Sequence, residues 1–305
     1  MFTNRREFLK TTAALGGAAM LPYSLAMGAD APLMAIARWK GDENAPMMEV
    51  AEKLTVEAIR AIGGLEPFIK KGGTVWVKPN IGWDRTPEQA ANTHPGVVKA
   101  LVRLCYEAGA GKVKVGDNPC NDIRKSYQNS GIEAAAKEAG AEVVYLDRNR
   151  FREMEIGGKR LTSIPIYPDI FESDLVISVP VAKHHSSTRV TLCMKNYMGV
   201  VENRKKFHQD LPYCIADLTK FMKPRISVVD ATRLLMDHGP TGGDLNDVKI
   251  TRTVAAGTDI VALDAFGAEL LGNKPELIGT IRVGAEYGLG VIDYKSLNPK
   301  EVTAA

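Results

Sequence analysis

The chain has 305 residues, with 39 lysines and arginines against 36 aspartates and glutamates, for a formal net charge of +3. Three of the basic residues and one acidic residue lie within residues 1–29, so the rest of the chain is close to neutral. A near-neutral chain has no electrostatic footprint for nucleic acid or for an anionic membrane surface, and we expect neither as a partner.

The N-terminus resembles an export signal. Residues 4–10 read Asn-Arg-Arg-Glu-Phe-Leu-Lys, and paired arginines in this setting are recognised by the twin-arginine export machinery. The apolar run at 11–21 is shorter than the roughly 20 residues that span a bilayer. Small residues around Ala26 offer a cleavage site. We predict a signal peptide over 1–29, delivery to the periplasm or another extracytoplasmic compartment, and no stable membrane span.

The remaining residues, 30–305, are expected to form a single α/β domain, with two lobes around a crevice as the alternative. Short apolar strands alternate with amphipathic helices, which predicts βαβ units and a mostly parallel sheet with helices on both faces. A polar hairpin is expected at 152–166. The predicted strands are 33–38, 74–78, 112–116, 142–146, 174–180 and 226–230, and the predicted helices are 47–62, 96–108, 131–139, 211–222, 259–271 and 275–287.

The four cysteines are Cys105, Cys120, Cys193 and Cys214, and no two form a Cys-x-x-Cys pair. This spacing matches neither a zinc ribbon nor a standard iron–sulfur run, so an iron–sulfur cluster is not expected. We expect free buried thiols. A Cys105–Cys120 or a Cys193–Cys214 disulfide is the alternative in an oxidising compartment.

Polar side chains follow four of the predicted strands. Parallel α/β sheets bind ligands outside the carboxyl ends of their strands, so these side chains are candidates for one binding site. The residues at these four strand ends are Lys78 and Asn80, Asp117 and Asn118, Lys183, and Asp230.

The stretch 183–208 contains many basic residues and almost no acidic ones. Lys195 and Asn196 lie within an apolar run, where a lysine needs a partner or a task. Two adjacent histidines on an extended chain point in opposite directions, and of His184 and His185 we choose His185 as the one that faces a ligand. The candidate catalytic residues are His185, Lys195 and His208, while Arg204, Lys205 and Lys206 are interpreted as a solvated basic loop. Lys195 and Arg189 would neutralise an anion, and His185 and His208 would move protons or bind a metal.

A glycine-rich run at 237–244 contains Gly242 and Gly243. Its backbone N–H groups could bind an anion, and a tight surface turn is the alternative. His94 is expected either to face the crevice or to cap the helix that begins after it. Asp259 is expected to complement the dipole of the helix that follows it.

The chain resembles the domain-of-unknown-function family numbered 362. The matching segments are VKPN (77–80), THPGVVKAL (93–101), KVKVGDNP (112–119), DLVISVPVAKHHSSTRVTLCMKNYMGVV (174–201), GPTGGD (239–244) and AAGTDIVALDAFGAELLG (255–272). Several relatives carry an additional ferredoxin-like segment with clustered cysteines, which this chain does not have.

The chain is more loosely similar to the nickel-pincer lactate racemase group of α/β proteins. That group has a histidine-rich strand end, then a lysine, then a further histidine around its cofactor, and His185, Lys195 and His208 follow a similar order. The glycine-rich run that precedes the lysine of that group is absent here.

These observations favour an exported enzyme that acts on a small oxygenated or anionic molecule, with a metal ion or an organic cofactor loaded before export. In this hypothesis Asp117 and Asp230 orient a histidine, bind a cation or hold a hydroxyl group. The alternatives are a non-catalytic protein that binds or matures a metal or cofactor and, least favoured, an iron–sulfur redox protein.

Overall fold

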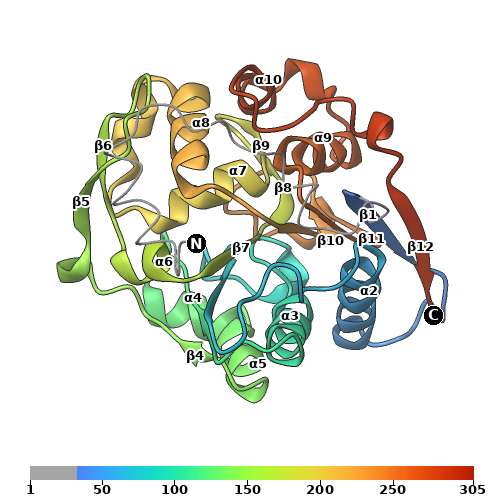
Figure 1. Ribbon diagram of the computed structural model, residues 1–305. Helices are drawn as coiled ribbons and strands as arrows, with labels where there is room; N and C mark the ends of the chain where they lie inside the picture. The colour runs from blue at the N-terminus through green and yellow to red at the C-terminus, as the bar shows by residue number, and fades with distance from the viewer. Residues whose placement is uncertain (1–32) are drawn as a thin grey trace.

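The computed structural model describes residues 33–305, so the predicted signal peptide lies outside the described residues (Figure 1). A ten-stranded mixed sheet runs through the centre, in the order β12-β1-β11-β10-β7-β2-β3-β4, with β8 and β9 attached beside β10. The strands of this sheet are β1 (Met34–Trp39), β2 (Thr74–Pro79), β3 (Lys112–Val115), β4 (Glu142–Val143), β7 (Leu175–Val179), β8 (Val181–His185), β9 (Arg189–Thr191), β10 (Ser227–Leu235), β11 (Val248–Gly257) and β12 (Lys300–Ala304).

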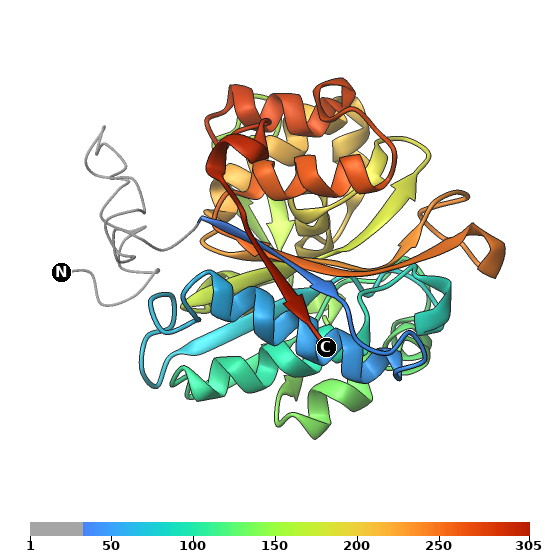
Figure 2. The same cartoon turned by 90° about the vertical axis from the view of Figure 1, so that its right-hand side faces the viewer.

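Helices cover both faces of this sheet, as predicted, and Figure 2 shows the blue-to-green helices on one side of it and the orange-to-red helices on the other. The helices are α2 (Met47–Ala61), α3 (Pro95–Glu107), α4 (Ile123–Asn129), α5 (Ile132–Glu138), α6 (Pro168–Glu172), α7 (Cys193–Asn196), α8 (Leu211–Met222), α9 (Ile260–Leu270) and α10 (Gly279–Glu286). The 3-10 helices are η2 (Pro87–Gln89), η3 (Arg148–Arg150), η4 (Tyr197–Val200), η5 (Arg204–Gln209), η6 (Leu245–Asp247), η7 (Pro275–Leu277) and η8 (Tyr294–Leu297).

Two hydrophobic cores lie on opposite sides of the sheet, because successive side chains of a strand point to opposite faces. In β2, Val75 and Val77 belong to the core under α2, α3 and α5, whereas Trp76 belongs to the core under α8 and α9. All three side chains are buried. This double coverage explains why the central strands are apolar along almost their whole length.

The sheet is parallel from β10 through β7, β2 and β3 to β4, as predicted. Its other edge is antiparallel, because β11 lies between β10 and β1 and runs against both. Neither β11 nor β12 was expected from the sequence, and β12 pairs with β1 in parallel. The strand expected at 142–146 is only two residues long, and the helix expected at 275–287 is divided into η7 and α10.

Two short hairpins lie on the α8 side of the sheet. The predicted polar hairpin is present as β5 (Arg152–Glu155) and β6 (Ser163–Ile166), paired antiparallel. The second is formed by β8 and β9, which also pair antiparallel. β8 follows β7 in the chain, pairs with β10 and carries Lys183 and His185. Among residues 33–305, no helix has both the length and the apolar character needed to cross a membrane.

Candidate functional site

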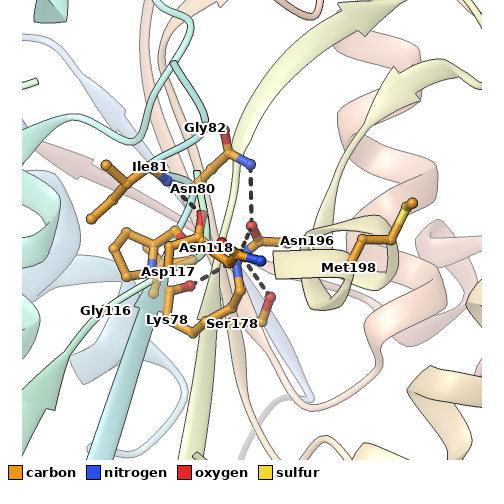
Figure 3. A network of polar contacts seen from close by, with 12 residues as sticks. Lys78, Asn80, Ile81, Gly82, Gly116, Asp117, Asn118, Ser178, Asn196 and Met198 are labelled. Carbon is orange, nitrogen blue, oxygen red and sulfur yellow. Dashed lines mark hydrogen bonds and ion pairs between the residues drawn. The ribbon is translucent and has the colours of Figure 1, made fainter. Parts of the chain in front are cut away.

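The carboxyl ends of β2, β3 and β7 meet at one edge of the parallel sheet, and polar side chains gather there. β2 supplies Lys78 and the following Asn80, and the residue after Gly116 at the end of β3 is Asp117. The short helix α7 lies against this edge and adds Asn196, which Figure 3 shows directed at Lys78 and Asn80. The strand-end pattern in the sequence therefore identified residues that are in contact in the structure.

Lys78 and Asp117 form a buried ion pair in which Nζ lies 2.7 Å from Oδ1 (Figure 3). Lys78 is fully buried, and this burial lowers the pKa of its ammonium, opposed by the charge of Asp117. The other carboxylate oxygen of Asp117 accepts a hydrogen bond of 2.7 Å from the Ile81 N–H. Gly199 packs against the pair so closely that a Cβ atom there would lie 2.6 Å from the lysine Nζ. The pair is thus enclosed by backbone on more than one side.

Asn196 fixes the position of α7 relative to the strand ends. Its Oδ1 accepts hydrogen bonds from Lys78 Nζ at 2.9 Å and from Asn80 Nδ2 at 3.3 Å. Its Nδ2 donates to the Lys78 carbonyl at 3.0 Å and to the Ser178 hydroxyl at 3.1 Å. Because all of these partners belong to β2, β7 or the residue after β2, the adjacent Lys195 is held at a defined place beside the sheet edge.

Lys183 lies at the base of the site and is only 1% exposed. Its ammonium donates three hydrogen bonds, to the Ala91 carbonyl at 2.6 Å, to Asn80 Oδ1 at 3.1 Å and to the Pro240 carbonyl at 3.1 Å. None of these acceptors carries a charge. Burial, and secondarily the positive charge of Lys195, lower the pKa of Lys183 to about 7.

A cavity of about 210 Å³ opens above Lys183. The Lys195 ammonium faces it without a hydrogen-bond or ion-pair partner among residues 33–305. Burial and the charge of Arg204 lower the pKa of Lys195 to about 8. The cavity is lined by Asn80, Gly82, Trp83, Asp117, Asn118, Cys120, Lys183, His185, Ser187, Thr191, Lys195, Asn196, Met198, Gly199, Arg204, His208, Leu211 and Pro240.

His185 lines the cavity, whereas His184 points elsewhere and accepts the Gly239 N–H at its Nδ1. The Ser187 N–H donates to His185 Nδ1 at 3.1 Å, so the neutral ring carries its proton on Nε2. Burial, followed by the charges of Lys195 and Lys183, lowers the pKa of His185 to about 3. The imidazole is therefore neutral at physiological pH and offers Nε2–H as a donor.

Several cavity residues were not among the sequence candidates, and three of them, Arg204, Cys120 and Thr191, are polar groups of chemical interest. Arg204 was interpreted as part of a solvated loop, yet its guanidinium donates to the Met198 carbonyl at 3.1 Å and to Cys120 Sγ at 3.2 Å, and also to the Asn118 carbonyl. The Thr191 hydroxyl is buried and has no hydrogen-bond partner among the described residues. Only the fold reveals these three, because 70 or more residues separate Cys120 from Thr191 and Arg204 in the chain.

Several sequence candidates lie outside the cavity lining. Arg189 is exposed at the start of β9. Asp230 is buried and accepts the His94 N–H at 2.7 Å and the Thr232 N–H at 2.9 Å, so it organises the backbone before α3. His94 itself caps α3 by accepting the Gly96 N–H at Nδ1.

The glycine-rich run contributes to the cavity in a way the sequence did not suggest. Gly242 and Gly243 have positive φ angles and pack on the segment before α3, where their carbonyls accept hydrogen bonds from Arg85 and Gln89. Within the described chain the run presents the Pro240 carbonyl to Lys183, and neither glycine lines the cavity.

All four cysteines are free thiols. Cys105, Cys193 and Cys214 are buried as expected, but Cys120 is exposed at the mouth of the cavity. The alternative disulfides are therefore not formed in this structure.

With this geometry in hand, comparison with known proteins identifies the family. A family model described as "Domain of unknown function (DUF362)" matches residues 75–269, which include every residue of the cavity lining. The chain belongs to the DUF362 family. A model of the twin-arginine translocation pathway signal sequence matches residues 3–22, so this DUF362 protein is exported by the twin-arginine route to an extracytoplasmic compartment.

A curated relative, a thylakoid-associated protein of Synechocystis, is 26% identical over 241 residues, which are 76% of this chain and 73% of that protein. Among solved structures, the lactate racemase apoprotein from Thermoanaerobacterium thermosaccharolyticum matches with a TM-score of 0.50 at 10% identity. The match covers 77% of this DUF362 protein but only 56% of the racemase chain. A Thermotoga maritima protein matches at a TM-score of 0.41 and 12% identity, over 81% of this chain and 61% of that one. The racemase likeness shows a shared α/β fold.

The three residues that follow the racemase order, His185, Lys195 and His208, line one cavity of this DUF362 protein. Their roles remain predictions. Over residues 33–305, no group of three or more His, Cys, Asp or Glu side chains is placed to hold a metal ion. A metal held by His185 and His208 alone would have fewer protein ligands than the three or four that zinc sites use.

Proposed function

We propose that this protein is an exported enzyme that binds a small oxygenated anion, of the hydroxycarboxylate class, in the cavity above Lys183. The observation that carries the proposal is the Lys195 ammonium, which faces the cavity with no partner among the described residues. An ammonium in this environment keeps its proton near neutral pH only at a cost in desolvation, and a bound carboxylate would offset that cost.

The charge balance of the cavity supports an anionic ligand. Lys183, Lys195 and Arg204 line it, and the carboxylate among its lining residues, Asp117, is neutralised by the Lys78 ammonium 2.7 Å away. The nearest acceptors of Lys183 are an amide oxygen and two carbonyls, which leave its charge uncompensated. A cation would meet repulsion here, whereas a carboxylate would find two ammonium groups and a guanidinium.

The neutral hydrogen-bonding groups of the cavity favour a ligand that also carries a hydroxyl or carbonyl oxygen. The buried Thr191 hydroxyl lacks a partner in the described chain, and a buried polar group without one is costly. His185 offers Nε2–H to the same space. Beside its carboxylate, a 2-hydroxy acid carries one hydroxyl oxygen, whose two lone pairs can accept from these donors. The lactate racemase whose fold this chain shares is, by its name, a protein that acts on such an acid.

Lys195 is the group best suited to proton transfer. Its pKa of about 8 allows it both to give and to take a proton near neutral pH, which is the condition for efficient general acid–base catalysis. His185, with a pKa of about 3, would act as a hydrogen-bond donor from Nε2 and would remain uncharged. His208 is exposed at the rim and is placed to contact the outer part of a ligand.

The test uses protein purified natively from the exported fraction. Turnover of a panel of 2-hydroxy acids is measured by chiral chromatography, and binding of oxalate is measured by calorimetry. Lys195→Met should abolish turnover and weaken oxalate binding at least about tenfold, or about 1.4 kcal/mol. The matched control is Lys249→Met, which removes an exposed lysine of β11 outside the cavity lining.

Unchanged oxalate affinity in Lys195→Met would refute the proposed anion site. If the wild-type protein binds an organic ligand or metal stoichiometrically, by mass spectrometry and metal analysis, but converts no acid of the panel, the protein is a carrier rather than an enzyme.

A further inference from the structure

A second depression of about 550 Å³, called the groove below, opens beside the cavity. Asn118, Cys120, Arg204 and His208 line both spaces, so the two adjoin along this shared wall. The groove adds residues from η3 and from the segment before and within η5. Its full lining is Asn118, Pro119, Cys120, Arg148, Glu202, Asn203, Arg204, Lys205 and His208.

The groove is strongly basic. Arg148 reaches it from η3, and Arg204 and Lys205 reach it from η5, whereas Glu202 is the one acidic residue of the lining. The side chains of Arg148 and Lys205 are exposed and have no hydrogen bond or ion pair with any residue from 33 to 305. The positively charged side chains of Arg148 and Lys205, from η3 and η5, thus line one groove with no partner among the described residues.

Arg204 stands between the cavity and the groove and is held in place. Its guanidinium donates from Nε to the Met198 carbonyl at 3.1 Å and from Nη1 to Cys120 Sγ at 3.2 Å, while Nη2 donates to the Asn118 carbonyl. A guanidinium has five N–H donors, so two remain for a ligand. A fixed guanidinium with free donors is well suited to the oxygens of a phosphate or carboxylate.

We propose that the cavity and the groove form one site for a phosphorylated carboxylic acid. The carboxylate end lies in the cavity at Lys195 and Lys183, and the phosphate end lies in the groove between Arg148 and Lys205, with Arg204 between the two ends. A phosphate monoester carries up to two negative charges and three acceptor oxygens, which match the excess of cations in the groove. This inference rests on the proposed anion site in the cavity and names the substrate class of that site.

Cys120 provides a readout that needs no knowledge of the reaction. It is the exposed thiol among the four free cysteines, and it lies on the wall that the cavity and groove share. A ligand that occupies both spaces should slow alkylation of Cys120 by iodoacetamide. The other three thiols are buried and should react slowly, so peptide mass spectrometry can follow this one site.

The experiment compares protection of Cys120 by phosphorylated acids of increasing length with protection by their unphosphorylated counterparts. The probes are phosphoglycolate, 3-phosphoglycerate and 4-phosphoerythronate, against glycolate, glycerate and erythronate, with inorganic phosphate as a further control. At least one phosphorylated acid should protect at a concentration about tenfold lower than its counterpart, equivalent to about 1.4 kcal/mol.

The double variant Arg148→Gln/Lys205→Gln should remove this advantage and leave protection by glycolate, glycerate and erythronate unchanged. Both side chains are exposed and unpaired in the described chain, so this variant should fold normally. The matched control is Lys249→Gln/Lys300→Gln, which removes the same charge from exposed positions of β11 and β12 outside both linings.

Failure of the phosphate site and failure of the proposed function give different results. If no phosphorylated acid protects better than its counterpart, or if the advantage survives in Arg148→Gln/Lys205→Gln, the groove is not a phosphate site, while the proposed function stands as long as Lys195→Met weakens oxalate binding. If Lys195→Met leaves oxalate binding intact but the phosphorylated acids still protect through Arg148 and Lys205, the proposed function fails and the assignment of the carboxylate end to the cavity fails with it.

Discussion

The Lys78 ammonium lies 2.7 Å from the Asp117 carboxylate at the carboxyl ends of two adjacent parallel strands, and both side chains are almost fully buried. Asp117 lines the cavity, whereas Lys78 lies behind it. The pair therefore cancels the carboxylate that faces the cavity and leaves Lys183, Lys195 and Arg204 uncompensated. A local arrangement at the strand ends thus sets the balance of charge in the cavity lining.

Breaking this pair from one side should destabilise the protein strongly. Asp117→Asn leaves the buried Lys78 ammonium without a counter-ion, a change that typically costs about 3–5 kcal/mol. Burial already lowers the pKa of Lys78, so its ammonium should lose its proton more readily in this variant. The free energy of unfolding, measured by urea titration at pH 7, should fall by this amount.

The double variant Lys78→Met/Asp117→Asn removes both charges and serves as the comparison. It should be more stable than Asp117→Asn alone, because no uncompensated charge remains in the protein. Equal stability of Asp117→Asn and the wild type would show that the pair contributes no structural free energy.

Anion affinity should decrease as the pH rises through the pKa values of Lys183 and Lys195, about 7 and 8. Each lysine attracts an anion only while protonated, and both lose that proton well below their ordinary value of 10.5. His185, with a pKa of about 3, stays neutral over this range and adds no change. Calorimetry with oxalate from pH 6 to 10 should show the decrease, and Lys195→Arg should make it shallower because arginine keeps its charge.

The free energy of unfolding should rise with pH between about pH 7 and pH 10, whereas anion affinity falls over the same interval. The folded-state pKa values of both lysines lie below the unfolded value, so between about pH 7 and pH 10 the unfolded chain binds more protons than the folded one. The contribution of these two groups to the free energy of unfolding therefore rises with pH. A Lys195→Met variant should show a smaller rise than the wild type, and an equal rise would contradict the lowered pKa.

The sequence predicted much of the fold because its signals were local. The near-continuous apolar strands at 74–78 and 174–180 and the amphipathic helix at 96–108 all appear within two residues of their expected limits. The strand-end rule also found Lys78, Asn80 and Asp117, since parallel neighbours bring their carboxyl ends to one edge. Those three residues are in contact, directly or through Asn196.

The sequence did not predict features that depend on strand pairing or on contacts between residues far apart in the chain. β11 is polar in its outer half and pairs antiparallel with β10 and β1, which no alternation with helices indicates. Arg204 reads as one of three consecutive basic residues, and only its packing against Met198 and Cys120 distinguishes it. Asp230 was expected at a strand end like Asp117, but β10 continues to Leu235, and the oxygens of Asp230 accept backbone N–H groups from His94 before α3 and from Thr232 within β10.

Asp264 of α9 should position the turn that carries Lys195. Its carboxylate is 2% exposed and accepts the N–H of Cys193 at 2.6 Å and that of Met194 at 3.2 Å. Asp264→Ala would leave both N–H groups unpaired, at a cost of about 1–3 kcal/mol each. Oxalate affinity should fall together with stability, because α7 loses its support beneath Lys195.

The Asp264→Asn variant tests the protonation state of this carboxyl. Burial raises the pKa of Asp264 to about 7, so its contribution to stability is present at low pH and is lost as the pH rises through about 7. The asparagine does not titrate. The wild type should therefore exceed Asp264→Asn in stability by more at pH 5 than at pH 8, as measured by urea unfolding, and a pH-independent difference would refute the raised pKa.

Export should depend on both arginines of the signal sequence that matches residues 3–22. Arg5→Lys/Arg6→Lys keeps the charge of the N-terminus and removes the guanidinium pair that the twin-arginine machinery recognises. The protein should then remain in the cytoplasmic fraction, as followed by immunoblot of cell fractions. Lys10→Arg is the control and should be exported, since it leaves the pair and the net charge intact. Normal export of the Arg5→Lys/Arg6→Lys variant would mean that another route carries the protein, and the reason to expect cofactor loading before export would disappear with it.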